Sequence, residues 1–357
     1  MNKKEERSVM NIKVIKPSQL SLLQQDWEKI EKQSDMTYFQ TYEWNKLLVE
    51  QFNKQMKRRI YRKVRYVTLF DNCGNIRIIV PLRIKRLVKK KKLIREIELL
   101  GADSFSDYVN LIYPDDIKDE EFSFVIDYIK RNYRNYTNSL SSLPEKSKLV
   151  GYLKHFYAEN VEDFYKTVVI PVNRFQSFEE YYQSLSKSTR QNYRTSCNRM
   201  KKDNVELEYK LFAGKIEGKL IDTLLRINLE RTIEKNPNRF ATKFSIIREK
   251  ASLRLNNIIR NMMTNLTNCW TLVTYLNGDA AGFLTGARND NNIYVMMNKV
   301  KPEYEFYSPM IVSIIEYIKD LYEVNFNGIL DFGRGTETYK YKLGGEERNL
   351  VSFKLEL

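Results

Sequence analysis

The sequence predicts an α+β protein of two domains, each built on a mixed, mainly antiparallel sheet flanked by helices. The chain has 357 residues, which is more than one ordinary domain holds. Turn signals at residues 71–74 and at Asn277-Gly278 each separate two runs rich in β-branched and aromatic residues, a pattern typical of hairpins. In both halves the hairpin is followed by a third strand and a helix, an order that differs from strictly alternating βαβ units. We therefore expect one domain at residues 1–165 and a second at residues 166–357.

Apolar periodicity places the elements of the first half. Leu20, Leu23 and Trp27, for example, recur at helical spacing. Helices are expected at residues 17–32, 41–52 and 120–133, and strands at residues 11–15, 64–70, 76–83 and 94–100, with a further strand and a short helix within residues 138–160. The basic runs at residues 57–63 and 83–92 are expected to be solvated loops, and contact with a polyanion or a membrane surface is the alternative.

The second half follows the same reasoning. Strands are expected at residues 167–172, 205–212, 270–276, 281–287, 292–298 and 350–357, and helices at residues 178–185, 186–202, 220–233, 245–263 and 310–322. The loop at residues 236–240 is a candidate substrate loop, and a plain connector is the alternative.

One helix near the start of the second half carries a basic stripe. Lys187, Arg190 and Arg194 fall on one helical face, whereas Tyr193 and Met200 fall on another. This pattern predicts a clamp for an anionic substrate or cofactor, and an exposed charged face is the alternative.

A second distinctive stretch lies near the C-terminus, where an apolar run ends in Asp331 and two glycines then flank Arg334. A strand that ends in glycines commonly delivers side chains to a cleft, and the alternative is a strand-to-helix turn. Upstream, Ser308 is expected to be an N-cap with Pro309 at the first helical position. The N-terminus of that helix would offer free N–H groups to a phosphate.

Residue types that many enzymes need are scarce. His155 is the single histidine and is expected on a helix surface. Cys73, Cys197 and Cys269 are odd in number and widely spaced, which argues against a disulfide framework or a zinc site and favours a reducing compartment. We expect no metal. There is no apolar run of about 18 residues and no signal-peptide pattern, so we expect no transmembrane segment and a cytoplasmic location.

These motifs resemble the GNAT acyltransferase superfamily, specifically its CelD-like branch, which is related in architecture to the FemAB-like aminoacyl transferases. The matching residues are 279–283, 307–309, 331–335 and 339–340, with further matches at 39–44, 81–82 and 100–101. Together they touch most of the chain, and the resemblance implies two tandem GNAT-like domains. One departure is Met310, because the branch often has glycine directly after the Ser-Pro pair.

The resemblance also implies a co-substrate. Acetyl-CoA or another acyl-CoA would lie between splayed central strands, with its pyrophosphate at a helix N-terminus. The implied donor-binding residues are Tyr294, Val295 and Met296 on a strand, and Tyr307, Ser308 and Met310 at the following turn.

No nucleophile motif appears, which fits direct acyl transfer from donor to acceptor. Asp331 is expected to act as base or to orient the substrate, and a loop-capping acid is the alternative. Tyr339 would protonate the leaving thiolate, unless it is a packed aromatic. Arg334 is expected to bind an anion, or else to pair with Asp331 or Glu337. The resemblance places Lys340 in the cleft.

The function expected from these observations is N-acyl transfer from acyl-CoA to an amine, with an amino sugar or a cell-envelope polysaccharide precursor as the acceptor that the resemblance implies. Asp107 and Tyr108 would join the substrate contacts if two such domains face each other across a cleft. The net charge of +15 predicts attraction to polyanions. Two other functions are therefore compatible with the sequence: a tRNA-dependent aminoacyl transferase, and a non-catalytic module that binds acidic glycan or nucleic acid. The same charge is compatible with peripheral contact with an anionic membrane.

Overall fold

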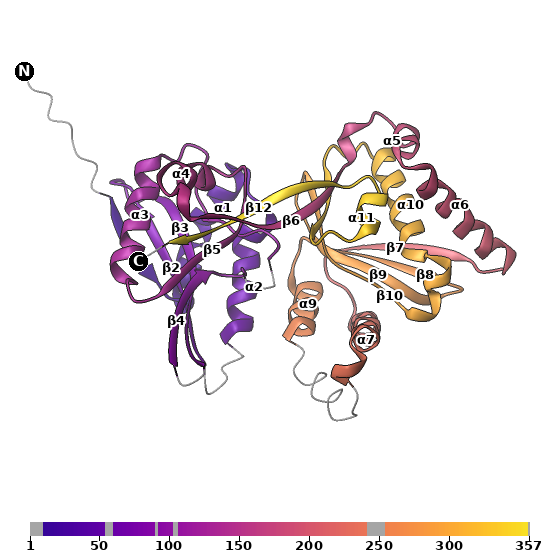
Figure 1. The fold of residues 1–357 in the computed structure, drawn as a ribbon, viewed down its shortest axis with the longest axis horizontal. Coiled ribbons are helices and arrows are strands. Elements are labelled where there is room, and N and C mark those ends of the chain that lie inside the picture. Colours follow the sequence, from indigo (N-terminus) through magenta and orange to yellow (C-terminus); the bar gives the residue numbers. More distant parts are fainter. Residues whose placement is uncertain (1–9, 54–59, 90–91, 103–105, 241–253, 356–357) are drawn as a thin grey trace, which may run out of the picture. The chain divides into compact units, whose positions relative to one another are not determined.

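The protein, described here by a computed structural model, is placed for residues 10–53, 60–89, 92–102, 106–240 and 254–355. The chain divides into two compact units (Figure 1). Met1–Tyr165 and Asn349–Leu357 form the first unit, and Lys166–Arg348 forms the second. The predicted second domain ran to residue 357, but the final strand pairs with the first unit from Leu350 to Leu355. That each unit folds as an independent domain stays a prediction.

The first unit is built on a sheet with the strand order β1-β2-β3-β4-β5-β12. Neighbouring strands are antiparallel except β4 and β5, which are parallel. The strands are β1 (Asn11–Ile15), β2 (Ile60–Phe70), β3 (Ile76–Lys89), β4 (Lys92–Leu99), β5 (Thr137–Pro144) and β12 (Glu346–Leu355), and the helices are η1 (Pro17–Leu23), α1 (Gln24–Lys32), η2 (Tyr38–Gln40), α2 (Tyr42–Asn53), α3 (Asp119–Asn132), α4 (Lys148–Phe156) and η3 (Ala158–Asn160).

Alternation along the strands gives this sheet two apolar faces. On one face Phe122 of α3 and Leu149 of α4 pack into the same buried cluster as Val67 of β2. On the other face Trp27 of α1 meets Tyr66 of β2 edge-on, with ring centroids 5.8 Å apart. The helix predicted at residues 17–32 is present as a 3-10 helix followed by α1.

The basic run at residues 83–92 was wrongly predicted to be a loop. Strand β3 continues to Lys89, β4 begins at Lys92, and the two strands pair in register up to those residues. The pairing places Ile84 opposite Ile97, and such apolar cross-strand pairs stabilise a hairpin despite the intervening lysines. In the other basic run, residues 60–63 belong to β2, whereas residues 57–59 lie outside the described residues.

The second unit has the strand order β6-β11-β10-β9-β8-β7, with β10 and β11 as a parallel pair and the other determined pairs antiparallel. The strands are β6 (Val161–Pro171), β7 (Leu207–Ala213), β8 (Cys269–Leu276), β9 (Asp279–Arg288), β10 (Asn292–Val300) and β11 (Ile329–Arg334), and the helices are η4 (Val172–Arg174), α5 (Phe178–Ser184), α6 (Lys187–Lys202), α7 (Gly218–Lys235), η5 (Pro237–Phe240), α9 (Arg254–Asn265), η6 (Pro302–Tyr307), α10 (Pro309–Glu323) and α11 (Thr338–Lys342).

Helices cover both faces of the second sheet. Figure 1 shows α5, α6 and α10 on one side of β8, β9 and β10, and α7 and α9 on the other. The α10 face holds a buried cluster that includes Leu284, Ile293 and Val295 from the strands. The helix predicted at residues 245–263 is present from Arg254, and residues 241–253 lie outside the described part of the chain.

The predicted hairpin between β8 and β9 is confirmed. Asn277 and Gly278 have φ angles of 48° and 81°, and a tight turn between twisted strands requires positive φ at both of its central positions. Asparagine and glycine are the residues that adopt this conformation at least cost.

Candidate functional site

The central feature of the second unit is a separation of its two parallel strands. Residues 292–294 of β10 pair with residues 329–331 of β11, and no further pairing of these strands is found among the described residues. The strands therefore part after Tyr294 and Asp331. We call the resulting gap, bordered by residues 295–298 and 332–334, the interstrand opening.

Both strands that border the opening are irregular there. The register of β10 against β9 shifts between Val295 and Met297, so Met296 lies in a bulge. Gly286 on β9 permits this bulge, because a Cβ atom at that position would collide with the carbonyl oxygen of Tyr294. Bulges of this kind turn backbone groups away from the ladder and are common beside active sites.

The loop after β11 is held by hydrogen bonds from within. The backbone N–H of Gly333 donates to Oδ1 of Asp331 at 2.7 Å, and the Asp331 side chain is buried. Gly333 and Gly335 have φ angles of 61° and 103°, which only glycine adopts readily. The loop-capping contact open to Asp331 from sequence is present, and its role as base or substrate-orienting group stays a prediction.

Lys340 holds the same loop from the other side. Its Nζ donates to the carbonyl oxygens of Arg334 at 2.9 Å and Gly335 at 3.0 Å, and it pairs with Glu337 at 2.9 Å. The Lys340 residue is 2% exposed. This placement differs from the cleft position predicted for Lys340, because the loop carbonyls and Glu337 engage its ammonium group.

Tyr339 lies beside the interstrand opening. Its ring meets Phe332 of β11 edge-on at 5.9 Å between centroids, and its hydroxyl is hydrogen-bonded to the side chain of Asn298 on β10. Tyr339 therefore connects the two separated strands. Burial raises the pKa of Tyr339 to about 12, so its hydroxyl stays protonated at neutral pH.

The three strand residues predicted to bind the donor are largely part of the sheet packing. Tyr294 and Val295 are buried, and Val295 belongs to the core on the α10 face. Met296 is half-buried in the bulge. The side chains of Tyr294 and Val295 are thus engaged in packing, which leaves the backbone of this segment as the group nearest the opening.

The predicted N-cap at Ser308 differs from the structure in one respect. Pro309 is the first residue of α10, as expected, but Ser308 has φ 49° and its side chain makes no capping hydrogen bond. Met310 is buried against β9, where a Cβ atom on Gly282 would lie 2.6 Å from its sulfur. Tyr307 donates its hydroxyl hydrogen to Asp203 at 3.0 Å.

The basic helix α6 has the two faces that the sequence predicted. Met200 is buried, whereas Lys187 and Arg194 are exposed. Arg190 is different, because its Nη1 donates to the carbonyl oxygens of Gln183 at 2.5 Å and of Leu185 at 2.6 Å. Arg190 thereby caps the C-terminal end of α5, and two of the three predicted clamp residues remain turned to solvent.

Asp107 and Tyr108 belong to the first unit, whereas the other predicted site residues belong to the second. Tyr108 is buried beside Phe39, with ring centroids 6.0 Å apart, and its carbonyl oxygen accepts a hydrogen bond from Gln40. Their contribution to a substrate site stays a prediction.

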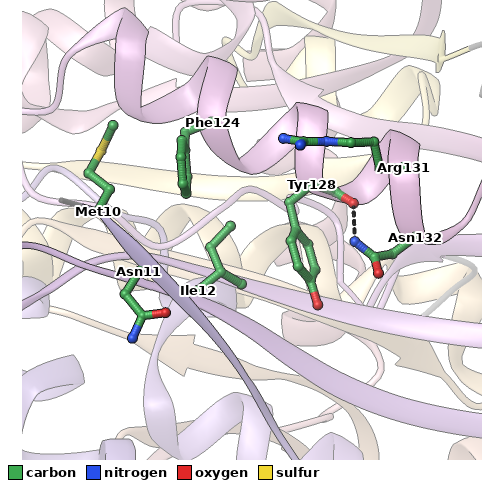
Figure 2. Close-up of a pocket in the computed structure, with 7 residues that line it drawn as sticks. All are labelled: Met10, Asn11, Ile12, Phe124, Tyr128, Arg131 and Asn132. Atoms are coloured by element: carbon green, nitrogen blue, oxygen red, sulfur yellow. Dashed lines mark hydrogen bonds between the residues drawn. The ribbon is translucent and has the colours of Figure 1, made fainter.

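A separate hollow of about 390 Å³ lies in the first unit (Figure 2). Figure 2 shows Met10 and Ile12 beside Phe124 and Tyr128 of α3, with Asn132 donating to the Tyr128 carbonyl oxygen at 2.9 Å. None of the predicted site residues lines this hollow, so it is distinct from the interstrand opening.

The predicted strand at residues 292–298 includes Asn298 but not Lys299, and sequence reasoning gave no role to either side chain. The bulge at Met296 changes which residues of β10 share a face of the sheet. Strict alternation counted from residue 292 assumes no bulge and so assigns the later residues to the wrong face. Glycine at position 286, opposite the bulge, was the available signal. His155 is exposed on α4, as predicted, and among the described residues none of the three cysteines forms a disulfide.

In the part of the chain that the structure describes, no group of three or more His, Cys, Asp or Glu residues could hold a metal ion. Within the same residues, none of the helices has the length and apolar character needed to cross a membrane.

Comparisons with known proteins give a domain match and a likeness of fold. Residues 187–341 match the family model described as an acetyltransferase (GNAT) domain. A conserved protein of unknown function from Bacteroides thetaiotaomicron VPI-5482 is similar in structure, with a TM-score of 0.54, 12% identity, and coverage of 97% of this chain and 100% of that chain. L-PGS from Bacillus licheniformis is also similar, with a TM-score of 0.50, 8% identity, and coverage of 93% and 91%. No curated protein matches the sequence.

At these identities the structural likeness concerns the fold. Together with the matched domain, it confirms the predicted resemblance to the GNAT superfamily and the predicted fold class of mixed sheets flanked by helices.

Proposed function

Since the chain carries a GNAT acetyltransferase domain at residues 187–341, we propose that it moves an acyl group from acyl-CoA to the amine of an acceptor. The observation that carries this proposal is the separation of β10 and β11 beside a protonated tyrosine. An extended acyl thioester fits between two strands that no longer pair, because their backbone groups are then available to it.

The residues at the opening supply the elements of direct transfer. Backbone N–H groups of the bulge at Met296 would stabilise negative charge on the thioester oxygen. As the acceptor nitrogen forms its bond to the carbonyl carbon, the carbon–sulfur bond breaks and the thiolate takes a proton from the Tyr339 hydroxyl. The proton lost by the amine passes to a base that the sequence leaves open between a carboxylate, a tyrosine and a water chain.

Within this proposal Asp331 and Lys340 are positioning residues. Asp331 fixes Gly333, and Lys340 fixes the carbonyl groups of Arg334 and Gly335. Both hold the loop that leads to Tyr339. We further propose, from the resemblance to the CelD-like branch, that the acceptor is an amino sugar or a cell-envelope polysaccharide precursor and that the reaction takes place in the cytoplasm.

A second candidate is aminoacyl transfer from tRNA. The sequence of α6 holds six lysines and arginines and no acidic residue, and Lys187 and Arg194 are exposed. Such a helix suits contact with a phosphate backbone. A non-catalytic module that binds acidic glycan or nucleic acid would use the same surface.

The test is a thermal-shift titration at moderate salt with acetyl-CoA, free CoA, uncharged tRNA and heparin in parallel. A ligand bound only by the folded protein raises the melting temperature by mass action. A saturable shift with acetyl-CoA that persists as salt rises, and that is lost in Ser308→Glu, is the expected result. A shift with tRNA or heparin alone that vanishes with salt would overturn acyl-CoA dependence in favour of the second candidate or the binding module.

A further inference from the structure

Lys299 lies on the face of the second sheet that α7 covers. It pairs with Phe283 of β9, and that residue alternates with Leu284, which packs on the α10 face. Since successive strand residues point to opposite faces, Lys299 points away from α10. The next residue toward the opening is Asn298, which holds Tyr339. Lys299 is thus one strand position from the proposed reaction centre.

The surroundings of Lys299 are rich in cations. Burial lowers the pKa of Lys299, and the charges of Lys235 and Arg231 on α7 lower it further, whereas Glu337 opposes them. Lys299 is half-buried, and within the described residues no hydrogen bond or ion pair joins its ammonium group to another side chain.

Three acids of the described residues, near Lys299 or near Arg231, are already engaged in ion pairs. Glu305 pairs with Arg231, Glu234 pairs with the same arginine, and Glu337 pairs with Lys340 at 2.9 Å. A half-buried ammonium that lacks a close counter-ion and lies among like charges is unfavourable unless an anion reaches it. The free-energy cost of burying this ammonium group falls when a ligand supplies that anion.

Accordingly, we propose that Lys299, supported by Lys235, binds an anionic group of the acyl acceptor, either a carboxylate or a phosphate. This inference rests on the proposed acyl transfer and adds the substrate class: the acceptor carries an acid as well as its amine. The charges that act on Lys299 of β10 come from two other elements: Lys235 and Arg231 lie on α7, and Glu337 lies in the loop after β11.

The anion belongs to the acceptor because the seat predicted for the donor pyrophosphate lies on the other face. Met310, at the start of α10, packs against Gly282, which is the neighbour of Phe283 on β9. Gly282 and Phe283 therefore face opposite sides of the sheet, as do Met310 and Lys299. Two anionic groups on opposite faces fit two different molecules that meet at the opening.

The experiment compares wild type with Lys299→Met, Lys299→Arg and Lys210→Met. Lys210 is an exposed strand residue on β7, three strands away from β10 at the edge of this sheet, and controls for loss of one lysine. Each protein is titrated with inorganic phosphate and, separately, with succinate, while saturating acetyl-CoA fills the donor site, and the melting temperature is followed. The dissociation constant for acetyl-CoA is measured on the same proteins.

We expect Lys299→Met to weaken the binding of phosphate or succinate about tenfold or more, the loss of one charge-assisted contact, while Lys299→Arg and Lys210→Met retain it. Acetyl-CoA affinity should stay within about twofold in every variant. An unchanged anion response in Lys299→Met overturns the inference, and so does an equal loss of acetyl-CoA binding, which would assign the lysine to the donor phosphates. If acetyl-CoA binds no variant while the anion response still depends on Lys299, the acyl-CoA proposal fails and the anion site stands.

Discussion

Each unit has a short parallel strand pair at the centre of its sheet. The two units differ in the chain segments that border the gap beyond this pair. In the first unit, residues 96–98 of β4 run parallel to residues 137–139 of β5. In the second, residues 292–294 of β10 run parallel to residues 329–331 of β11. In each case the parallel contact spans three residues, and the flanking strands on either side are antiparallel.

The units differ in the chain segments that lie beyond this short parallel contact. In the first, β4 ends at Leu99, and residues 109–112 take its place: Ile112 bridges Ile79 of β3, and Val109 donates to the carbonyl oxygen of Ser142 on β5. In the second, a glycine loop and Tyr339 border the gap. The chain's own backbone therefore satisfies the central strands of the first unit, and the comparison assigns the candidate site to the second.

Removal of the Tyr339 hydroxyl should have the largest effect, and it tests whether the second unit holds the active site. Tyr339→Phe should lower turnover by roughly 100-fold or more, because a positioned general acid contributes at least that much. The matched control is Tyr341→Phe on the same helix, whose exposed hydroxyl donates to Glu347 at 2.7 Å and which should keep near-normal turnover. The measurement is release of free thiol from acetyl-CoA with a panel of amine acceptors.

The dependence of turnover on pH is a second test of Tyr339 as the general acid. The pKa of Tyr339 is raised to about 12 by burial, so the acid form persists below that value. Wild-type turnover should therefore show no decline from this group between about pH 8 and 10. Equal rates for Tyr339→Phe and Tyr341→Phe across that range would remove Tyr339 from the mechanism.

Substitution of two glycines, one in each unit, tests whether turnover depends on the loop after β11 and not on a turn of the first unit. Gly335 and Gly74 both have positive φ, at 103° and 83°, but a Cβ atom would meet Glu337 at 2.6 Å in the first case and open space in the second. Substitution by alanine should cost each protein about 1 kcal/mol of unfolding free energy for the strained backbone. Gly335→Ala should in addition lose roughly 100-fold in turnover through misplacement of Tyr339.

Turnover and melting temperature measured on both alanine variants separate these effects. Similar losses of turnover in Gly74→Ala and Gly335→Ala would mean that general destabilisation, and not the position of the loop, controls activity.

The smallest expected effect concerns the first unit alone. Burial raises the pKa of Glu31 to about 7, the backbone N–H of Tyr42 acts in the opposite direction, and Glu28 and Glu43 add to the rise. The folded state thus binds a proton that the unfolded state releases near pH 4.5, so stability from this group is present at low pH and is lost as pH rises through 7. Glu31→Gln should be more stable than wild type by about 1 kcal/mol at pH 8, with the difference vanishing near pH 4.5.

Urea unfolding at the two pH values measures this difference, and acetyl-CoA binding by Glu31→Gln serves as the readout for the second unit. A change in acetyl-CoA affinity in this variant would mean that the two units are energetically coupled, contrary to the assignment of the candidate site to the second unit alone.

Much of the fold was accessible from sequence because local rules decide it. The Asn277-Gly278 turn, the start of α10 at Pro309 and the buried face of α6 follow from backbone preference and periodicity alone. The hairpin of β3 and β4 did not, because its lysines and arginines hide a cross-strand apolar pattern that appears only when both strands are aligned.

The candidate site was harder to predict, because its geometry depends on departures from regular structure. The bulge at Met296 is a property of two strands and not of one. The resemblance places Lys340 in the cleft, whereas in the structure it pairs with Glu337, three residues earlier, and donates to the loop carbonyls. The role proposed for Lys299 depends on charges of α7, whose residues lie more than 60 positions earlier in the sequence.

The pairing of β12 with β5 has a consequence for biosynthesis. The second unit is one continuous segment, Lys166–Arg348, so a ribosome delivers all of it before the first unit has its final strand. Until residues 350–355 emerge, the β5 edge that they cover is open to other chains. The N-terminal unit is therefore the later of the two to complete its sheet during translation, and its strand edge stays exposed until the end of synthesis.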